Sequence, residues 1–122
     1  MPKRVLPHNH GEPLEGLLER IPESDEMRAV SDLFKEISDS TRIRIFLLLC
    51  HCEECVINIS AMMDMSAPAV SHHLARLRSA GLIVSRREGK EVYYRAADSR
   101  AAQLMHRMIE DMMEIACPDI LQ

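Results

Sequence analysis

The sequence predicts a single, mainly α-helical domain that carries one small β-hairpin. Its 122 residues suit one hydrophobic core, because single domains typically comprise about 100 to 200 residues. That core must consist mainly of Leu, Ile, Val, Ala and Met, because aromatic residues make up only 3% of the chain and Trp is absent. These residues favour helices. The hairpin is indicated by two β-rich runs on either side of Gly89.

The N-terminal region predicts a flexible arm followed by two helices. Proline and polar residues occupy the first 13 positions without periodicity, which favours the arm. Apolar spacing then predicts a short amphipathic helix from Leu14 to Ile21, stopped by Pro22. A second helix is expected over residues 25–38. Its apolar stripe consists of Met27, Val30, Leu33, Phe34 and Ile37.

The centre of the chain predicts a third helix and then a helix-turn-helix. Ser40 is expected to cap the third helix, which runs through Leu49 with Arg42 and Arg44 facing solvent. After a cysteine-rich segment interpreted as a loop, Asn58 occupies a capping position before a short helix rich in Ile and Met.

The next helix is capped by Ser66, has Pro68 in its first turn and ends at Gly81. Two short helices separated by a tight break, the second capped and polar on one side, are typical of a helix-turn-helix. The buried face of the second helix is expected to consist of Val70, Leu74 and Leu77.

The C-terminal third predicts a wing and a dimerisation helix. Residues 82–86 and 91–95 flank a Gly-containing loop and should form a hairpin. A long helix capped by Asp98 then runs until Pro118. A terminal helix with a continuous apolar seam needs a partner, so we expect a homodimer formed through the terminal helices. The seam consists of Ala101, Leu104, Met105, Met108, Met112 and Ile115.

These elements divide the chain into a flexible arm (1–13), a winged helix-turn-helix domain with N- and C-terminal dimerisation helices (14–117) and a tail (118–122). The longest uncharged apolar stretch, residues 45–50, is far shorter than the ~20 residues that span a bilayer. Residues 1–16 lack the apolar centre of a signal peptide. We therefore expect a cytoplasmic protein with no membrane partner.

Charge is distributed unevenly along the chain. The net charge of −4 by itself disfavours a nucleic-acid partner. Residues 1–39 carry nine acidic and five basic side chains, and residues 96–122 carry five and two. By contrast, residues 66–95 carry six basic and only two acidic side chains. The basic centre coincides with the predicted helix-turn-helix and wing, which favours double-stranded DNA as the partner.

Four segments of the chain resemble the ArsR/SmtB family of metalloregulatory repressors. The resemblance covers residues 25–115. It implies a dimeric winged-helix repressor that needs no cofactor to bind its operator and leaves the operator when a metal, metalloid or thiol oxidant binds. No enzyme activity is expected. The matching segments are residues 39–45, 67–77, 80–83 and 87–94.

The recognition helix and the wing supply the predicted DNA contacts. Short Ser and Ala side chains let a helix approach the major groove, and His and Arg donate to base edges or phosphates. Adjacent residues on a helix point ~100° apart, so His72 and His73 are not expected to chelate one ion; one should face DNA and the other pack inward. The predicted contacts are Ser66, Ala67, Ala69, Ser71, His72, His73, Arg76, Arg86, Arg87 and Lys90.

Three of the four cysteines, Cys50, Cys52 and Cys55, lie within six positions. In a reducing cytosol such a cluster indicates metal or redox chemistry rather than structural disulfides. Three thiolates suit As(III), Cd(II), Pb(II) or Cu(I), or Zn(II) with a histidine as fourth ligand. The alternatives are a buried, inert Cys50 and a two-sulfur site. The candidate histidines are His8, His10 and His51.

Both metal positions that the resemblance implies are altered here. A family Cys-Val-Cys-Asp run reads Cys-Val-Ile-Asn at residues 55–58, so one thiolate is missing. On the terminal helix, two family histidines are absent and Arg100 stands at one of their positions. An intersubunit ion pair from Arg100 to Asp111 and Glu114 would occupy that position. The alternative is a zinc or other divalent-metal site built from Asp98, His106, Asp111 and Glu114.

Two other classes of function stay open at this point. A thiol enzyme needs a cysteine activated by a base, and His51 beside Cys52 is the one hint of such a pair. A protein-interaction module would use the Met-rich terminal helix without touching DNA. Salt dependence separates this module from a DNA-binding protein, because DNA affinity falls steeply with salt.

Overall fold

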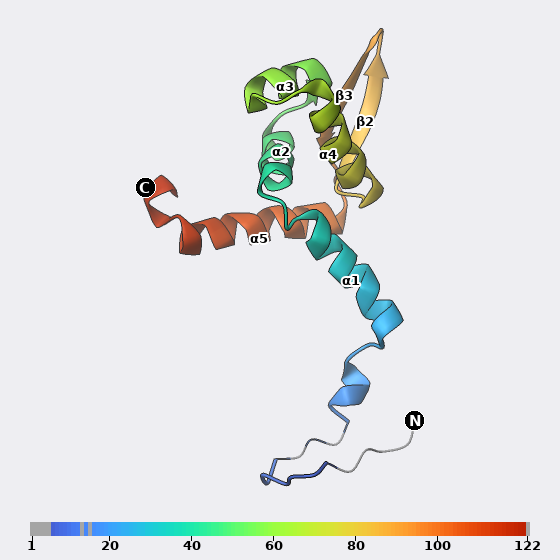
Figure 1. The fold of residues 1–122 in the computed structure, drawn as a ribbon, viewed down its shortest axis with the longest axis vertical. Helices are drawn as coiled ribbons and strands as arrows, with labels where there is room; N and C mark the ends of the chain where they lie inside the picture. The colour runs from blue at the N-terminus through green and yellow to red at the C-terminus, as the bar shows by residue number, and fades with distance from the viewer. Residues whose placement is uncertain (1–5, 13, 15, 122) are drawn as a thin grey trace.

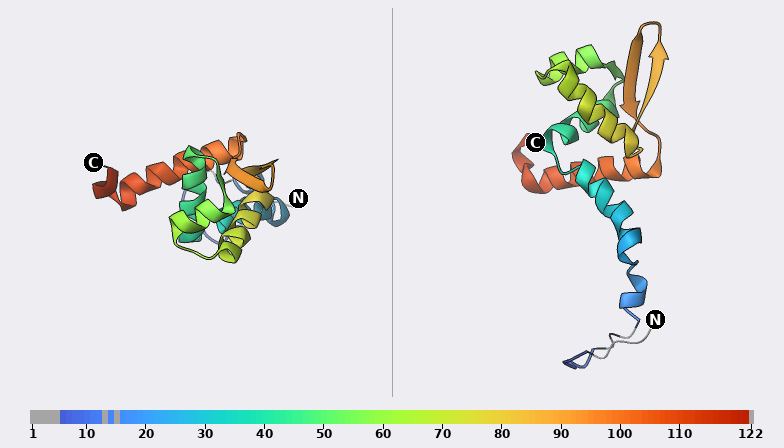
Figure 2. Two further views of the ribbon diagram at one scale, coloured as in Figure 1. Left: turned by 90° about the horizontal axis from the view of Figure 1, so that it is seen from above. Right: turned by 45° about the vertical axis from the view of Figure 1, so that its right-hand side comes forward.

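A computed structural model of the chain describes residues 6–12, 14 and 16–121. Within these residues, five α-helices combine with a three-stranded antiparallel sheet. Helices α3 and α4 pack with the hairpin at one end of the molecule, α5 lies across the base of this unit, and α1 projects away from it (Figures 1 and 2). The mainly α architecture with a β-hairpin wing is therefore confirmed.

The elements follow the predicted order. They are η1 (Leu18–Arg20), α1 (Ser24–Glu36), α2 (Ser40–His51), β1 (Glu54–Cys55), α3 (Val56–Met63), α4 (Ala67–Ser79), β2 (Ile83–Glu88), β3 (Glu91–Ala96), α5 (Arg100–Ala116) and η2 (Pro118–Leu121).

The predicted helix from Leu14 to Ile21 is reduced to the single 3-10 turn η1. Gly16 has a φ of +81°, a left-handed conformation that interrupts any helix at this point. The apolar side chains of this segment are exposed, so no packing supports a longer helix. Residues 6–12 form no helix or strand. The rest of the predicted arm, residues 1–5 and 13, and position 122 of the tail lie outside the described residues.

Two helix caps are displaced by one residue from their predicted positions. The carboxylate of Asp39, rather than the Ser40 hydroxyl, accepts the backbone N–H of Arg42 at 3.0 Å and caps α2. The hydroxyl of Ser99, rather than Asp98, caps α5. In each pair both residue types are good caps, so helix packing rather than cap chemistry selects the first residue. The predicted Ser66 cap of α4 is confirmed.

The cysteine segment is ordered by a short strand, not a loop. β1 pairs antiparallel with β3, with Glu54 opposite Tyr94 and Cys55 opposite Tyr93. Helix α3 begins directly after Cys55, so Asn58 lies inside the helix and not at its cap. Its side-chain amide instead donates to the Glu54 carboxylate at 2.8 Å. The segment is thereby fixed to the wing on one side and to α3 on the other.

The wing is a regular hairpin at the edge of the sheet. β2 pairs with β3 from Ile83–Ala96 to Glu88–Glu91, so β2 extends two residues further toward the tip than predicted and β3 one residue further at its base. The strand order is β1-β3-β2. Gly89 opens the two-residue turn with a φ of +62°, a conformation that a residue with a Cβ adopts at a cost.

The core lies where α2, α4, the base of the wing and α5 meet. Helix α1 contributes no buried side chain to it. The most deeply buried side chains are Ile45, Phe46, Leu49, Ile59, Val70, Leu74, Leu77, Leu82 and Ile83. One face of α5 closes the core with Ala102, Met105 and Ile109.

A partly buried ionic cluster joins α1 to α2 and to α4. Arg42, predicted to face solvent, is only 6% exposed, and its guanidinium donates to the Glu36 carboxylate at 3.1 Å. Arg76 of α4 donates to the same carboxylate from two nitrogens at 2.8 to 3.2 Å. We call Glu36, Arg42, His73 and Arg76 the Glu36 clamp. Arg42 lies on the same helix face as Ile45, Phe46 and Leu49, which draws it inward.

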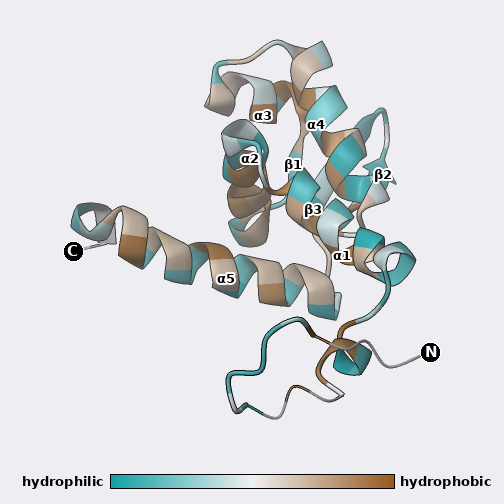
Figure 3. Ribbon diagram, turned by 60° about the horizontal axis from the view of Figure 1, so that its bottom comes forward, coloured by the Kyte–Doolittle hydropathy of each residue, from teal (hydrophilic) through white to brown (hydrophobic). Residues whose placement is uncertain are grey.

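Two helices present apolar faces that the protomer leaves uncovered. On α1, Met27, Val30 and Phe34 recur at helical spacing and all are exposed. On α5, Leu104, Met112 and Ile115 are 60 to 78% exposed, on the side away from the core. Hydrophobic residues are visible along α5 in Figure 3. None of the described helices is long and apolar enough to cross a lipid bilayer.

Candidate nucleic-acid interface and metal-ligating groups

The N-terminal half of α4 presents a short-chain, polar surface. Ser66, Ala67, Ser71 and His72 are exposed, and Ala69 is half-buried. Pro68 occupies the first turn, where its missing N–H breaks no helical hydrogen bond. No acidic residue occurs anywhere in α4, so the helix carries no charge that would repel a phosphate backbone.

Two of the predicted DNA contacts instead turn toward the protein. His73 is half-buried, and its Nδ1 accepts a hydrogen bond from Arg42 Nε at 3.3 Å. The side chain of Arg76 is 37% exposed, and its guanidinium donates hydrogen bonds to Glu36. The structure therefore separates the histidine pair as predicted: His72 faces solvent and His73 packs inward. A DNA contact by His73 or Arg76 stays a prediction.

The three predicted DNA contacts on the wing lie in two different environments. Arg86 donates to Glu53 at 2.8 Å and to Glu88 at 2.6 Å, and its guanidinium lies 5.0 Å from the Tyr93 ring centre. Its hydrogen bond lowers the pKa of the Glu53 carboxyl below the ordinary value. By contrast, Arg87 and Lys90 are exposed, and neither joins an ion pair with any residue that the structure describes.

The three clustered cysteines occupy different environments. Cys55 is buried at the N-terminus of α3, and Cys52 donates its S–H to the Leu48 carbonyl at 3.3 Å. Burial, followed by the nearby Glu110 carboxylate, raises the pKa of the Cys50 thiol to about 11. Burial likewise raises the pKa of Cys52. All are free thiols, and among the described residues they do not converge into a three-ligand group.

A cavity of about 320 Å³ opens beside these thiols. It lies between the end of α2, the cysteine segment and the first turns of α5. Cys50 and Cys52 line one side, and Asp98, Gln103 and His106 line the other. The cavity thus brings two of the predicted thiol ligands and two residues of the alternative ligand set, Asp98 and His106, to one place.

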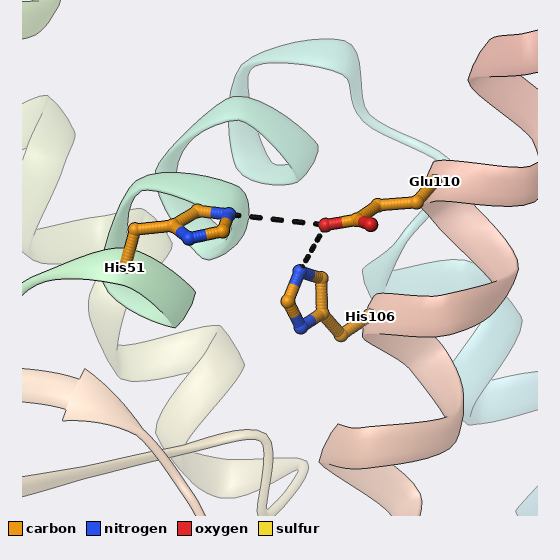
Figure 4. Close-up of side chains that lie close together, drawn as sticks. All are labelled: His51, His106 and Glu110. Atoms are coloured by element: carbon orange, nitrogen blue, oxygen red, sulfur yellow. Dashed lines mark ion pairs between the residues drawn. The ribbon is translucent and has the colours of Figure 1, made fainter.

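The structure assembles one group of metal-ligating atoms that sequence spacing did not reveal. His51 Nε2 lies 3.8 Å from Glu110 Oε1, and His106 Nε2 lies 2.5 Å from the same oxygen (Figure 4). The two imidazole rings are nearly perpendicular, with centres 5.2 Å apart. The four-residue spacing of His106 and Glu110 was the visible signal, but His51 joins them only through the packing of α2 on α5.

The alternative ligand set on α5 is not assembled within the described chain. Asp111 and Glu114 are exposed and belong to no three-ligand group there. Asp98 lies 3.6 Å from an Arg95 nitrogen. Of the four predicted residues, His106 alone enters a group, and it does so with other partners.

The N-terminal histidines lie apart from the cysteines. His8 and His10 stack with ring centres 5.8 Å apart. Their segment lies beyond the far end of α1, away from α2 and the wing (Figures 1 and 2). Within one protomer they therefore supply no ligand to the thiols.

Comparison with known proteins gives consistent matches. Residues 39–85 match a family model described as bacterial regulatory protein, arsR family. A transcriptional repressor SmtB homolog from Synechocystis sp. is 32% identical over 114 residues, which cover 93% of this chain and 86% of that protein. A cadmium resistance transcriptional regulatory protein CadC homolog from Staphylococcus aureus is 35% identical over 88 residues, covering 71% and 73%.

A solved structure shows the same architecture. The homodimeric winged helix-turn-helix DNA-binding domain of Mb0332 from Mycobacterium bovis, a possible ArsR-family transcriptional regulator, matches with a TM-score of 0.68 and 26% identity. The match covers 87% of this chain and 92% of that one.

The inward position of His73 predicts a pH dependence of stability. Burial lowers its pKa below the ordinary value of 6.5, and the charges of Arg42 and Arg76 act in the same direction, against Asp39. As the pH falls, His73 therefore binds a proton at a higher pH in the unfolded chain than in the folded chain. The contribution to stability is complete above about pH 6.5 and is lost as the pH drops toward the lower, folded pKa.

His73→Asn keeps a hydrogen-bond acceptor for Arg42 but does not titrate. Urea unfolding at about pH 7 and pH 5 should show a smaller acid-induced loss of stability for this variant than for the unaltered chain. His72→Asn, at the exposed neighbouring position, should leave that loss unchanged. Equal losses in the chain with and without His73 would contradict the assignment.

Proposed function

Because the chain belongs to the arsR family of bacterial regulatory proteins, whose members are DNA-binding transcriptional regulators and not enzymes, we propose that it is a homodimeric operator-binding repressor. Its operator is released when a thiophilic metal or metalloid, or a thiol oxidant, acts on the cysteine segment. The observation that carries this proposal is the exposed, acid-free N-terminal half of α4 beside the basic wing tip.

The recognition surface divides between base reading and backbone binding. Ser66, Ala67, Ser71 and His72 are short or exposed enough for α4 to lie in a major groove and meet base edges. At the wing tip, Arg87 and Lys90 are exposed and form no ion pair with the described residues, so they can bind phosphates or the minor groove. Arg86 donates a hydrogen bond to Glu53, so less of its positive charge is available to attract DNA.

The uncovered faces of α1 and α5 support a homodimer. Exposed Leu, Met, Ile and Phe side chains at helical spacing on two elements are typical of an association surface. The Mb0332 domain is homodimeric. A twofold arrangement would place two copies of α4 on half-sites ~34 Å apart, one helical turn of DNA.

The cysteine segment is connected physically to the wing. β1 pairs with β3, and Glu53, between Cys52 and β1, binds Arg86 of β2. A ligand that moves Cys52 or Cys55 therefore moves the wing. The CadC homolog is named for cadmium resistance, and thiolates suit Cd(II), As(III), Pb(II), Cu(I) and Zn(II). A coupling of about 1 to 3 kcal/mol between inducer and DNA is sufficient for regulation.

A DNA-binding titration tests this function. A duplex selected by the protein from a randomised pool is labelled, and its affinity is followed by fluorescence anisotropy with Zn(II), Cd(II), As(III) and a thiol oxidant in parallel. Without inducer, affinity should fall steeply with salt. One thiophilic inducer should weaken it by roughly 5- to 150-fold.

Single cysteine variants separate the segment from the rest of the chain. Release should be reduced in Cys52→Ser or Cys55→Ser and retained in Cys117→Ser, whose thiol is exposed at the end of α5. Salt-insensitive binding would contradict the DNA-binding role. Release by As(III) or by the thiol oxidant that survives both replacements in the segment would contradict the thiol mechanism.

A charge on the uncovered face of α5 should dissociate the dimer. Burying one leucine contributes ~1.5–3 kcal/mol, so Leu104→Glu should raise the dimer dissociation constant about tenfold or more. Analytical ultracentrifugation measures that constant. Gln103→Glu, an exposed neighbour on the same helix, is the matched control and should keep the dimer. An unchanged dimer in Leu104→Glu would exclude this face from the interface.

A further inference from the structure

We propose that His51, His106 and Glu110 bind a divalent cation of the zinc type where α2 meets α5 within one protomer. The site combines His51, considered above with the thiols, and His106, considered above with the α5 carboxylates, with Glu110, and it uses neither the thiols nor those carboxylates. The cation-binding claim stands on these residues alone, whereas its regulatory role rests on the proposed repressor function.

The three side chains converge from two elements. His51 is the last residue of α2, and His106 and Glu110 lie one turn apart on the same face of α5. One ligand atom from each residue falls within 4.8 Å of the others, and Glu110 Oε1 lies between the two imidazoles (Figure 4). Tetrahedral ligands with ~2.1 Å bonds stand ~3.4 Å apart, so shifts below ~1 Å complete the site.

Ordinary hydrogen bonding does not account for this arrangement. His106 Nε2 is buried, yet among the described residues it has no hydrogen-bond partner, although Glu110 Oε1 lies 2.5 Å away. At 3.8 Å, His51 Nε2 is also beyond hydrogen-bond distance from that oxygen. A buried nitrogen without a partner costs free energy, and a cation bound to its lone pair would remove that cost.

Charge and mobility also suit a cation. Among the described residues, Glu110 forms ion pairs with the two histidines and with no Lys or Arg, so its negative charge is not already neutralised by a fixed cation. The side chain of His106 is 30% exposed, whereas those of His51 and Glu110 are 66% and 52% exposed and have room to adjust.

The donor set selects the kind of ion. Two imidazoles and one carboxylate suit Zn(II), with Co(II) and Ni(II) as close substitutes, and leave a fourth position for water. Soft As(III) and Pb(II) prefer thiolates, so they would bind the cysteine segment instead. The site at His51, His106 and Glu110 and the cysteine segment would therefore respond to different classes of ion.

The position of the site connects it to both functional regions. A bound ion would fix the end of α2, one residue before Cys52, to α5. From Cys52 the chain enters β1, which is paired with the wing strand β3, while α5 carries the uncovered apolar face. Occupancy would thereby fix the wing relative to the helix proposed for dimerisation, and so change DNA affinity.

Cobalt absorption tests the site directly in the full, reduced chain. Co(II) bound by nitrogen and oxygen should give d–d bands without the thiolate charge-transfer band that cysteine ligation produces. Zn(II) should bleach these bands by competition. His106→Gln and Glu110→Gln should each weaken Co(II) binding at least about tenfold, since loss of even an outer-shell partner costs 10- to 100-fold.

Asp111→Asn alters the next carboxylate along α5, which is exposed, and should retain the bands. Circular dichroism confirms that each variant keeps its helices. Absence of the d–d bands, bands unaffected by His106→Gln, or loss of binding in Asp111→Asn would overturn the site.

The regulatory role has a separate readout. With the DNA assay above, Zn(II) should lower DNA affinity in a Cys52→Ser/Cys55→Ser variant and have no effect once Glu110→Gln is added. Cobalt binding at these residues without any change in DNA affinity would overturn the regulatory role. A chain that binds cobalt here but no DNA would contradict the proposed repressor function while supporting the cation site.

Discussion

The geometry of this protein depends on the hydrogen bonds that the Glu36 carboxylate accepts from two arginines. Glu36 ends α1 and receives hydrogen bonds from Arg42 of α2 and Arg76 of α4, so one charge joins three helices. Its pKa is held below the ordinary value, chiefly by the Arg76 hydrogen bond. Because α1 contributes no fully buried side chain to the core, this cluster, the half-buried Leu33 and the neighbouring Ile37 attach it to the rest of the domain.

In the proposed repressor, the clamp would let one small fold both bind DNA and respond to ligands. Helix α4 is fixed to α1 through Arg76, and the wing is fixed to the cysteine segment through Glu53 and Arg86. Both connections are ionic and partly exposed, so they can be rearranged more readily than the apolar core. Ligands at the thiols, or a cation between α2 and α5, would act on these connections. The core would remain intact while the spacing of two recognition helices changes.

The sequence predicted the order of elements, the Ser66 cap and the wing because each leaves a local pattern. It placed Arg42 at the surface, because arginine is mostly exposed unless it has a buried partner. The helix face that Arg42 shares with the buried Ile45 and Leu49 could have indicated its burial. The partner, Glu36, belongs to another helix. The two-residue strand β1 and the approach of His51 to His106 depend equally on tertiary packing, which spacing along the chain does not encode.

The measurement that tests the clamp most directly is the DNA affinity of Glu36→Gln, compared with Arg76→Gln and the double variant. Removing a negative charge near a DNA-binding surface should, by electrostatics alone, strengthen binding. If the clamp positions α4, Glu36→Gln should weaken binding severalfold, and the double variant should bind no worse than Arg76→Gln, because both changes break one interaction. Unchanged or stronger binding by a folded Glu36→Gln chain would contradict the account.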